Sequence, residues 1–457
     1  MTEIIKNTLR ESAFARWMAI FFMSFAMLFA YIFIDALAPF RILLERDFGW
    51  TPDIFGTVAG SAYFLNVIGF MLVAGIILDK MGVRRTAILS ALLMMFGAFI
   101  KSYGVSYTFI NGGFGYEFFS SFLPRIPASA KVAIVGFAIF GAGLEMAGIT
   151  VPKAIVKWFK GKEMALAMGM NLAIARLGAG LVFFVLPEFA LLYGFSTTIT
   201  LSALSLCIVV LSFGAYFLMD LKLERQDRES DVPEDLFKFS DLKQIFASKA
   251  FMIISGLCVL YYVAIFPFQK FALGMLESGL VDSPIAANRI FMFFPVGAMI
   301  LTPFLGWFLD SKGKGATMLI WGAGLMVVCH SFFAIFPNFS FPLALSAIVL
   351  LGISFSLVPA ALWPAVPRLV EDKVLGSAYG VIFWIQNIGL FFVPILIGFV
   401  LRATNVGIDI AAGDSYSYTW MMVIFASFGM LAMLLGFWLK AEDKKKGYGM
   451  ELPNKVK

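Results

Sequence analysis

Charged residues are scarce in this chain. Asp, Glu, Lys and Arg make up 14% of its 457 residues, and apolar residues make up 61%. An ordinary soluble domain is about 25% charged and about 45–50% apolar. Together with a mean hydropathy of +0.90, this composition excludes an ordinary soluble protein. It indicates a chain that crosses a lipid bilayer many times.

Cysteine and histidine are also rare, with three cysteines and one histidine. Cys207, Cys258 and Cys329 lie inside apolar runs without metal or redox spacing, so we interpret them as small core residues. His330 has no cluster of potential ligands around it. The sequence carries no nucleophile elbow, phosphate-binding glycine loop or zinc spacing. We therefore expect no enzyme activity, no metal and no cofactor.

Apolar stretches bounded by charged residues, Gly, Pro or Asn predict twelve membrane-spanning helices. A span needs roughly 20 apolar residues, and only the third stretch is short. The predicted spans are about 16–40, 52–77, 86–102, 131–159, 164–191, 196–220, 250–273, 285–309, 316–336, 342–366, 376–401 and 417–439. We expect an all-α polytopic membrane protein with two six-helix halves.

A strongly polar segment after the sixth span divides the chain. We expect an amino-terminal half at 1–221, a linker at 222–249, a carboxyl-terminal half at 250–440 and a tail at 441–457. Within the linker, apolar residues recur at helical spacing in Leu236–Phe239 and Leu242–Phe246. This spacing suits a helix that lies on the membrane surface.

The basic residues orient the predicted bundle. With twelve spans both termini share one side, and 26 of the 35 Lys and Arg residues lie on that side. Cytoplasmic loops carry an excess of Lys and Arg, so we expect both termini in the cytoplasm. The net charge of +6 is dispersed over short loops. It does not indicate a nucleic-acid partner.

Two charged residues lie near the middle of apolar runs, Glu145 within 132–159 and Arg176 within 164–191. Burying an ionised side chain at that depth costs several kcal/mol unless it is paired or hydrated. Glu145 and Arg176 therefore predict a polar cavity inside the bundle. Arg presents a planar fork to a carboxylate, and Glu accepts from an ammonium. Together they fit a zwitterion such as an amino acid or short peptide. A structural ion pair between the two helices and a monocarboxylate held by Arg176 alone are the alternatives.

A Gly-x-x-Leu-Asp motif occurs twice, at Gly75–Asp79 and Gly306–Asp310, each after the second helix of its half. Glycine permits close helix approach, and Asp can face the positive end of a helix from the other half. Arg84 and Arg85 follow the first copy and can bridge nearby acids. We expect Gly75, Asp79, Arg84, Arg85 and Asp310 to form a cytoplasmic gate. The alternative is that the basic residues only determine topology.

The duplicated motif and the twelve spans resemble the major facilitator superfamily, whose substrate site lies near the midplane between two halves. Several segments narrow the resemblance to lysosomal dipeptide transporters of that superfamily. These segments are Trp158–Glu163, Ala175–Gly178, Ala361–Pro364, Leu375–Gly380 and Ile385–Asn387, with Tyr31, Asp35 and Asn66–Val67. The resemblance implies a uniporter that moves dipeptides by alternating access, and we expect a monomer. It implies that Glu145 engages the amino end of the substrate and Arg176 the carboxylate end.

Aromatic and amide residues complete the candidate site. In the carboxyl half, the further substrate-binding candidates are Trp363, Tyr379, Trp384, Gln386 and Asn387. A second set contacts substrate or forms an outer gate: Tyr31, Asp35, Tyr63, Asn66, Tyr262 and Gln269. Amides inside an apolar helix need partners, which makes Gln386 and Asn387 the stronger candidates among the polar residues.

The chain departs from the lysosomal transporters in two places. Its short amino terminus shows no acidic dileucine signal, and the loop after the third span carries no Asn-x-Ser/Thr site. We therefore expect a prokaryotic relative in a plasma membrane, the bacterial inner membrane. The need for an accessory subunit stays open.

Two other functions compete with peptide uniport. One is an organic-anion exchanger or symporter of the same fold, in which Arg176 holds a carboxylate and Glu145 is its structural partner. The other is a transporter-like sensor that no longer moves substrate. An adjacent Arg176 would favour the ionised form of Glu145, which predicts that no proton accompanies the substrate.

Overall fold

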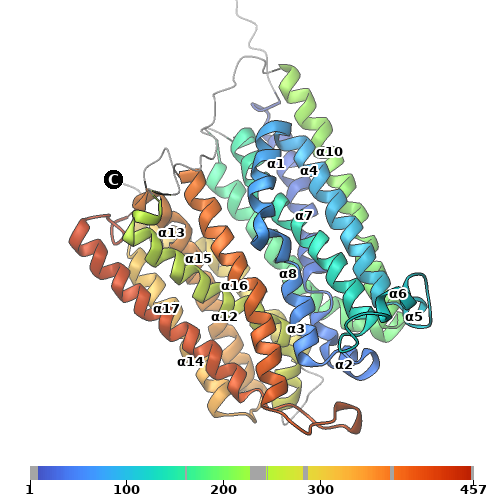
Figure 1. Ribbon diagram of the computed structural model, residues 1–457. Coiled ribbons are helices and arrows are strands. Elements are labelled where there is room, and N and C mark those ends of the chain that lie inside the picture. The colour runs from blue at the N-terminus through green and yellow to red at the C-terminus, as the bar shows by residue number, and fades with distance from the viewer. Residues whose placement is uncertain are drawn as a thin grey trace, which may run out of the picture.

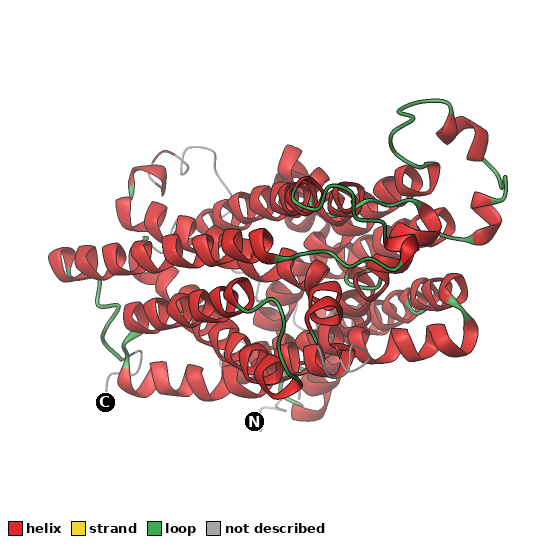
Figure 2. Cartoon of the chain, turned by 90° about the horizontal axis from the view of Figure 1, so that it is seen from below, coloured by secondary structure: helices red, strands yellow, loops and turns green. Residues whose placement is uncertain are grey.

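The computed structural model describes residues 9–159, 162–226, 243, 245–280, 287–370 and 375–453. Two groups of long helices stand side by side in Figure 1, one blue to green and the other yellow to red. The described part of the chain is helix and loop, as the colouring of Figure 2 shows. The predicted all-α class is therefore confirmed.

The amino-terminal half contributes the blue-to-green group. Its long helices are α1 (Ala13–Ile34), α3 (Pro52–Ser61), α4 (Met71–Gly104), α7 (Ala128–Phe159), α8 (Met164–Tyr193), α9 (Phe195–Leu204) and α10 (Leu206–Gln226). A π-helical segment, η2 (Asn66–Phe70), connects α3 to α4. Short helices in the loops are η1 (Ala38–Phe40), α2 (Arg41–Phe48), α5 (Tyr107–Ile110) and α6 (Tyr116–Ser120).

The carboxyl-terminal half contributes the yellow-to-red group. Its helices are α12 (Lys249–Gly279), α13 (Ala287–Lys312), α14 (Gly315–Ile335), α15 (Phe341–Leu369), α16 (Leu375–Ala403) and α17 (Thr419–Lys446), with η5 (Ile410–Ala412) in a loop. The most extensive packing between the halves joins α3 to α16 and α8 to α13.

Within the described ranges, eleven helical segments are long and apolar enough to cross a membrane. One of them, Pro52–Gly104, has 53 residues. Gly82 inside it has φ 75° and ψ 166°, which no helix adopts, so the chain turns there and crosses a second time. The twelve predicted spans are thus accounted for. The predicted surface helix falls largely on residues 236–242, outside the described residues.

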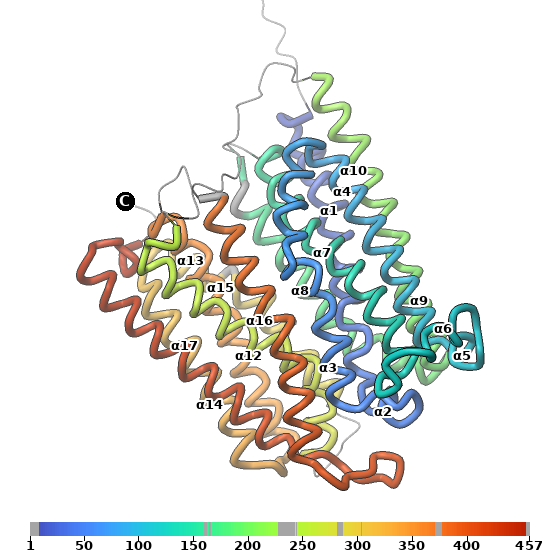
Figure 3. Tube along the Cα trace, in the orientation of Figure 1, coloured from blue at the N-terminus to red at the C-terminus, as the bar shows by residue number. Residues whose placement is uncertain are grey.

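The two ends of the bundle are distinct. We call the end with the start of α1 and the end of α17 the terminal face, and the opposite end, with the loops 35–51, 105–127 and 404–418, the far face. The chain can be followed from one face to the other in Figure 3. After α17, the tail folds back onto α14, where Thr317 N donates to the Glu451 carboxylate at 2.8 Å.

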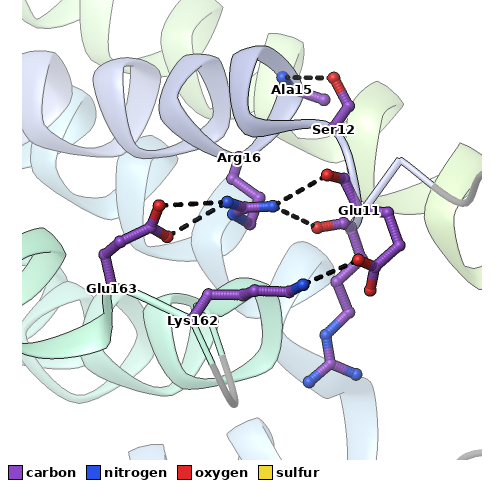
Figure 4. A network of polar contacts seen from close by, with 7 residues as sticks. Glu11, Ser12, Ala15, Arg16, Lys162 and Glu163 are labelled. Atoms are coloured by element: carbon purple, nitrogen blue, oxygen red, sulfur yellow. Dashed lines mark hydrogen bonds and ion pairs between the residues drawn. The ribbon is translucent and has the colours of Figure 1, made fainter.

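At the terminal face, α1 is tied to the connection between α7 and α8 (Figure 4). Arg16 donates to Glu163 at 3.1 Å and to the Arg10 carbonyl at 2.8 Å. Lys162 donates to Glu11 at 2.7 Å, and this hydrogen bond lowers the pKa of the Glu11 carboxyl. These contacts join helices of the amino half to one another.

Close backbone contact holds α4 against α7. A Cβ on Gly97 would lie 2.3 Å from Phe140 N, and one on Gly136 would lie 2.3 Å from Lys101 N. Small residues let membrane helices approach this closely, and packing is then the main attraction because lipid is as apolar as the helices. The glycines therefore set the spacing of α4 and α7, which position Lys101 and Glu145.

We expect Gly136→Ala to destabilise the protein by about 1–3 kcal/mol, the usual cost of overpacking a tight interior. The matched control is Gly214→Ala in α10, where a Cβ would have no neighbour within 4 Å. Thermal unfolding in detergent, followed by size-exclusion chromatography, measures both. Equal midpoints for the two variants would contradict the close contact of α4 with α7.

Candidate functional site

A cavity of about 260 Å³ lies between the two halves. This volume is slightly below the roughly 300 Å³ of the smallest drug-sized pockets, so its ligand is small. The predicted site residues that line it are Tyr31, Asp35, Tyr63, Glu145, Arg176, Tyr262, Gln269, Trp363 and Gln386. Both midplane charges therefore face the same cavity.

Arg176 on α8 is held by the opposite half. Its Nη1 donates to Thr302 Oγ1 and, at 3.3 Å, to the Ala298 carbonyl, both on α13. The guanidinium lies 4.8 Å from the ring centroid of Phe355 on α15, a cation–π contact. These contacts fix the guanidinium in position and leave other donors of its fork to meet a ligand.

Glu145 on α7 is also held by the opposite half. Its Oε2 accepts from Asn387 Nδ2 of α16 at 3.5 Å, and the same amide donates to the Phe383 carbonyl at 2.9 Å. Asn387 Oδ1 is buried without a partner among the described residues. Gly148, almost one turn along α7, would have nothing within 4 Å of a Cβ. Space therefore opens beside the carboxylate.

The direct Glu145–Arg176 ion pair expected from the sequence is not present between these described residues. Each charge takes its partners from the other half instead. The alternative of a structural pair locking α7 to α8 is therefore wrong for this conformation. The argument that Arg176 keeps Glu145 ionised loses its basis as well.

An aromatic wall lies beside the charges. Trp363 Nε1 donates to Tyr262 OH at 3.1 Å, and its ring stacks on Phe383 with centroids 5.0 Å apart. Tyr379 OH donates to the Trp363 carbonyl at 3.1 Å. Trp363 and Tyr262 line the cavity, whereas Tyr379 supports Trp363 from behind.

Trp384 bonds to the residue after Asn66, at a break in the second span. Gly69 in η2 has φ 109°, and the carbonyl of Val67 accepts from Trp384 Nε1 at 3.1 Å. Asn66 is buried, and neither of its amide atoms has a partner among the described residues. Trp384, Asn66, Tyr379 and Asn387 lie outside the lining of the cavity. Their contact with substrate stays a prediction.

Contacts between the halves close the far face. Lys270 of α12 donates to the Asp35 carboxylate and, at 2.9 Å, to the Ile34 carbonyl. Arg41 donates to Tyr418 OH at 2.6 Å, and Arg402 donates to Asp53 at 2.8 Å. Asp35 thus contacts the other half, and its role as an outer gate or as a substrate contact stays a prediction.

Lys270 is the residue that reading the sequence missed. It lies at the far end of the seventh predicted span, where it counts as a loop-side basic residue, yet it is only 7% exposed. The signal that could have found it is its neighbour Gln269, a second polar side chain at the same depth of an apolar helix.

The terminal face shows a different pattern. Asp79 accepts from Lys153 at 3.0 Å, and Arg84 bridges to Glu224 and to Asp220, all within the amino half. The expected bridging of acids by Arg84 is confirmed, whereas Arg85 is exposed. A Cβ on Gly75 or on Gly306 would have no neighbour within 4 Å. No described residue therefore makes the close approach expected of these glycines, and the gating role of the motif, with Asp310 at the end of α13, stays a prediction.

A family model for the Major Facilitator Superfamily matches residues 20–394 and 271–451 of the chain. The chain belongs to this superfamily. It is therefore a membrane transporter and not an enzyme.

Three comparisons describe the similarity to known proteins. The chain is 26% identical over 449 residues to the lysosomal dipeptide transporter MFSD1 of Danio rerio, covering 96% of this chain and 89% of that one. It is 28% identical over 310 residues to the Homo sapiens protein of the same name, covering 65% and 63%. The inward-open xylose transporter XylE from E. coli superimposes with a TM-score of 0.69 at 13% identity, covering 92% and 96%. The last comparison shows the major facilitator fold alone.

We expect Tyr418→Phe to favour opening of the far face, because it removes the hydroxyl that Arg41 bonds across the halves. Hydrogen bonds to charged groups contribute about 1.5–3 kcal/mol, so accessibility of a far-face reporter cysteine should rise roughly tenfold or more. The matched control is Tyr193→Phe, whose side chain is exposed. The same accessibility in Tyr418→Phe and Tyr193→Phe would mean that the Arg41–Tyr418 contact does not hold the face closed.

Proposed function

We propose that this transporter moves dipeptides and other short zwitterionic peptides by alternating access, as a uniporter. The observation that carries the proposal is one carboxylate and one guanidinium facing a single small cavity without pairing to each other. A ligand with an ammonium at one end and a carboxylate at the other complements both groups.

The arrangement separates the two ends of the ligand. Arg176 meets the carboxylate with a planar fork, and Glu145 meets the ammonium. Asn387 lies outside the cavity lining and holds the Glu145 carboxylate in place through its Nδ2, at 3.5 Å. The aromatic wall at Trp363 and Tyr262 provides apolar surface for a side chain.

The relatives support the same substrate class. The similar proteins of Danio rerio and Homo sapiens are named lysosomal dipeptide transporters. The conclusion for this chain depends on its own residues, because Glu145 and Arg176 face the cavity here. The gating motif Gly75–Asp79 belongs to the same proposal, as the latch of the terminal face when the far face opens.

An organic-anion exchanger is the second candidate, because Arg176 alone suffices to hold a carboxylate. It leaves Glu145 as a negative charge facing the same cavity, where it would repel an anion. The unpaired Glu145 therefore favours the zwitterion.

We also propose the location and the assembly state. The excess of basic residues on the terminal face supports a cytoplasmic location for both termini. We propose that the protein is a monomer in the plasma membrane, the inner membrane of a bacterium. Reporter fusions at Lys446 and in the loop 404–418 test the orientation. A reporter that is active only outside the cytoplasm should be silent at Lys446.

Arg176→Ala should lower affinity for dipeptides with a free carboxyl terminus by about 10- to 150-fold, because a charged hydrogen-bond pair contributes about 1.5–3 kcal/mol. Arg176→Lys should rescue little, since an ammonium cannot reproduce the planar fork. Isothermal calorimetry on purified protein measures both, and dipeptide amides should lose far less affinity than the free acids.

The control is Thr302→Val, which removes the anchor of Arg176 and keeps the guanidinium. It should weaken binding less than Arg176→Ala. Unchanged affinity in a folded Arg176→Ala protein would exclude Arg176 from the site. Tight binding of dicarboxylates, with no binding of dipeptides, would show that the substrate is an organic anion and not a zwitterion.

Transport of a neutral dipeptide should be electroneutral and should run in either direction down the peptide gradient. A zwitterionic dipeptide carries no net charge and offers one group of each sign to the guanidinium and the carboxyl group, so no proton needs to accompany it. Proteoliposomes with an imposed proton gradient measure this. Accumulation above the external concentration that collapses with a protonophore would show proton-coupled symport instead.

A further inference from the structure

Lys101 is a buried lysine that the proposed function does not use. It lies on α4 with 1% of its surface exposed. Its Nζ is 3.5 Å from the ring centroid of Phe137 and 4.6 Å from that of Phe33, and it donates no hydrogen bond to any described residue. A buried ammonium is costly to keep, and two ring faces compensate only part of that cost.

The surroundings of Lys101 point to one carboxylate. Phe33, which its ammonium faces, lies two residues before Asp35 on the chain. Lys101 and Lys270 also line a common void of about 10 Å³, close to the size of one water. Lys270 bonds to Asp35, and Lys101 lines the same void as Lys270 without bonding to any described residue.

The two lysines belong to different halves. Asp35 follows α1 and Lys101 lies on α4, both in the amino half, whereas Lys270 lies on α12 in the carboxyl half. Alternating access in this fold rocks one half against the other about the central site. Opening the far face therefore withdraws Lys270 from Asp35, while Lys101 and Asp35 move together.

We propose that Lys101 is a positioning residue of the transport cycle, which takes over the Asp35 carboxylate when the far face opens and Lys270 leaves. The inference depends on alternating access and not on the identity of the substrate.

The chemistry of lysine suits this exchange. A carboxylate left alone in the bundle would oppose opening, because a buried ion that loses its partner is strongly destabilised. The four-carbon stem of Lys101 is flexible and carries a point charge that bonds in many orientations. While the far face is closed, the second ammonium also repels Lys270. Lys101 therefore weakens the closed state and stabilises the open one.

The test measures conformation without substrate. Ala38→Cys, in a background whose natural cysteines are replaced, provides a reporter in the wall of the void, 3% exposed while the far face is closed. We expect Lys101→Met to slow its labelling from the far side by about tenfold, within the 5- to 150-fold range of coupled sites. Lys101→Arg keeps the charge and should label at close to the parent rate.

Two controls test whether Lys101 acts through the Asp35 carboxylate. Lys131→Met alters another buried lysine of the amino half, whose Nζ bonds the carbonyls of Phe119 and Phe122, and should leave labelling unchanged. In an Asp35→Asn background, the effect of Lys101→Met should vanish, because the two residues act through one interaction.

Two results would overturn the proposal. The first is an unchanged labelling rate in folded Lys101→Met, or in Lys101→Gln if the methionine variant does not fold. The second is an effect of the same size with and without Asp35, which would make Lys101 a packing residue. Neither result depends on dipeptide binding, so the proposed substrate is tested separately.

Discussion

A charged side chain inside a bilayer must find a partner, and for three charged groups of the amino half that partner comes from the opposite half. Arg176 of the amino half bonds to Thr302 of the carboxyl half, Glu145 bonds to Asn387, and Asp35 bonds to Lys270. The cost of an unpartnered charge in the bundle is several kcal/mol. Relative movement of the halves therefore requires each of these groups to exchange one partner for another, which couples the site to the conformation.

The polar contacts at the two faces of the bundle differ in whether they join the two halves. On the far face, Arg41 and Arg402 join one half to the other. On the terminal face, the ion pairs between described residues, such as Arg16 with Glu163 and Lys153 with Asp79, stay within one half. Contacts within a half survive a rocking motion, and contacts between halves do not. The contacts of Arg41 and Arg402 hold the halves together at the far face, and the gating role of the duplicated motif at the terminal face stays a prediction.

The candidate site could be predicted in part. Glu145 and Arg176 were recognisable because a charge in a long apolar run has no ordinary packing role, and the structure brings both to the cavity. Their mutual pairing was a wrong inference, since nearness along neighbouring helices does not specify which side chain lies opposite. Lys101 and Lys270 were missed, because a basic residue near the end of a span is ordinarily a topology signal; only the neighbouring Gln269 pointed to the burial of Lys270.

The sequence by itself determined the class of the molecule, the number of spans and the two charges that must face the interior. These properties follow from hydrophobicity summed along single segments, which needs no knowledge of neighbours. Only the tertiary structure decided the partners. Partner choice depends on distances between helices, and those distances are set by backbone contacts at residues such as Gly97 and Gly136, where an added methyl would overlap the adjacent chain. The position of a glycine in the sequence does not determine which helix packs against it.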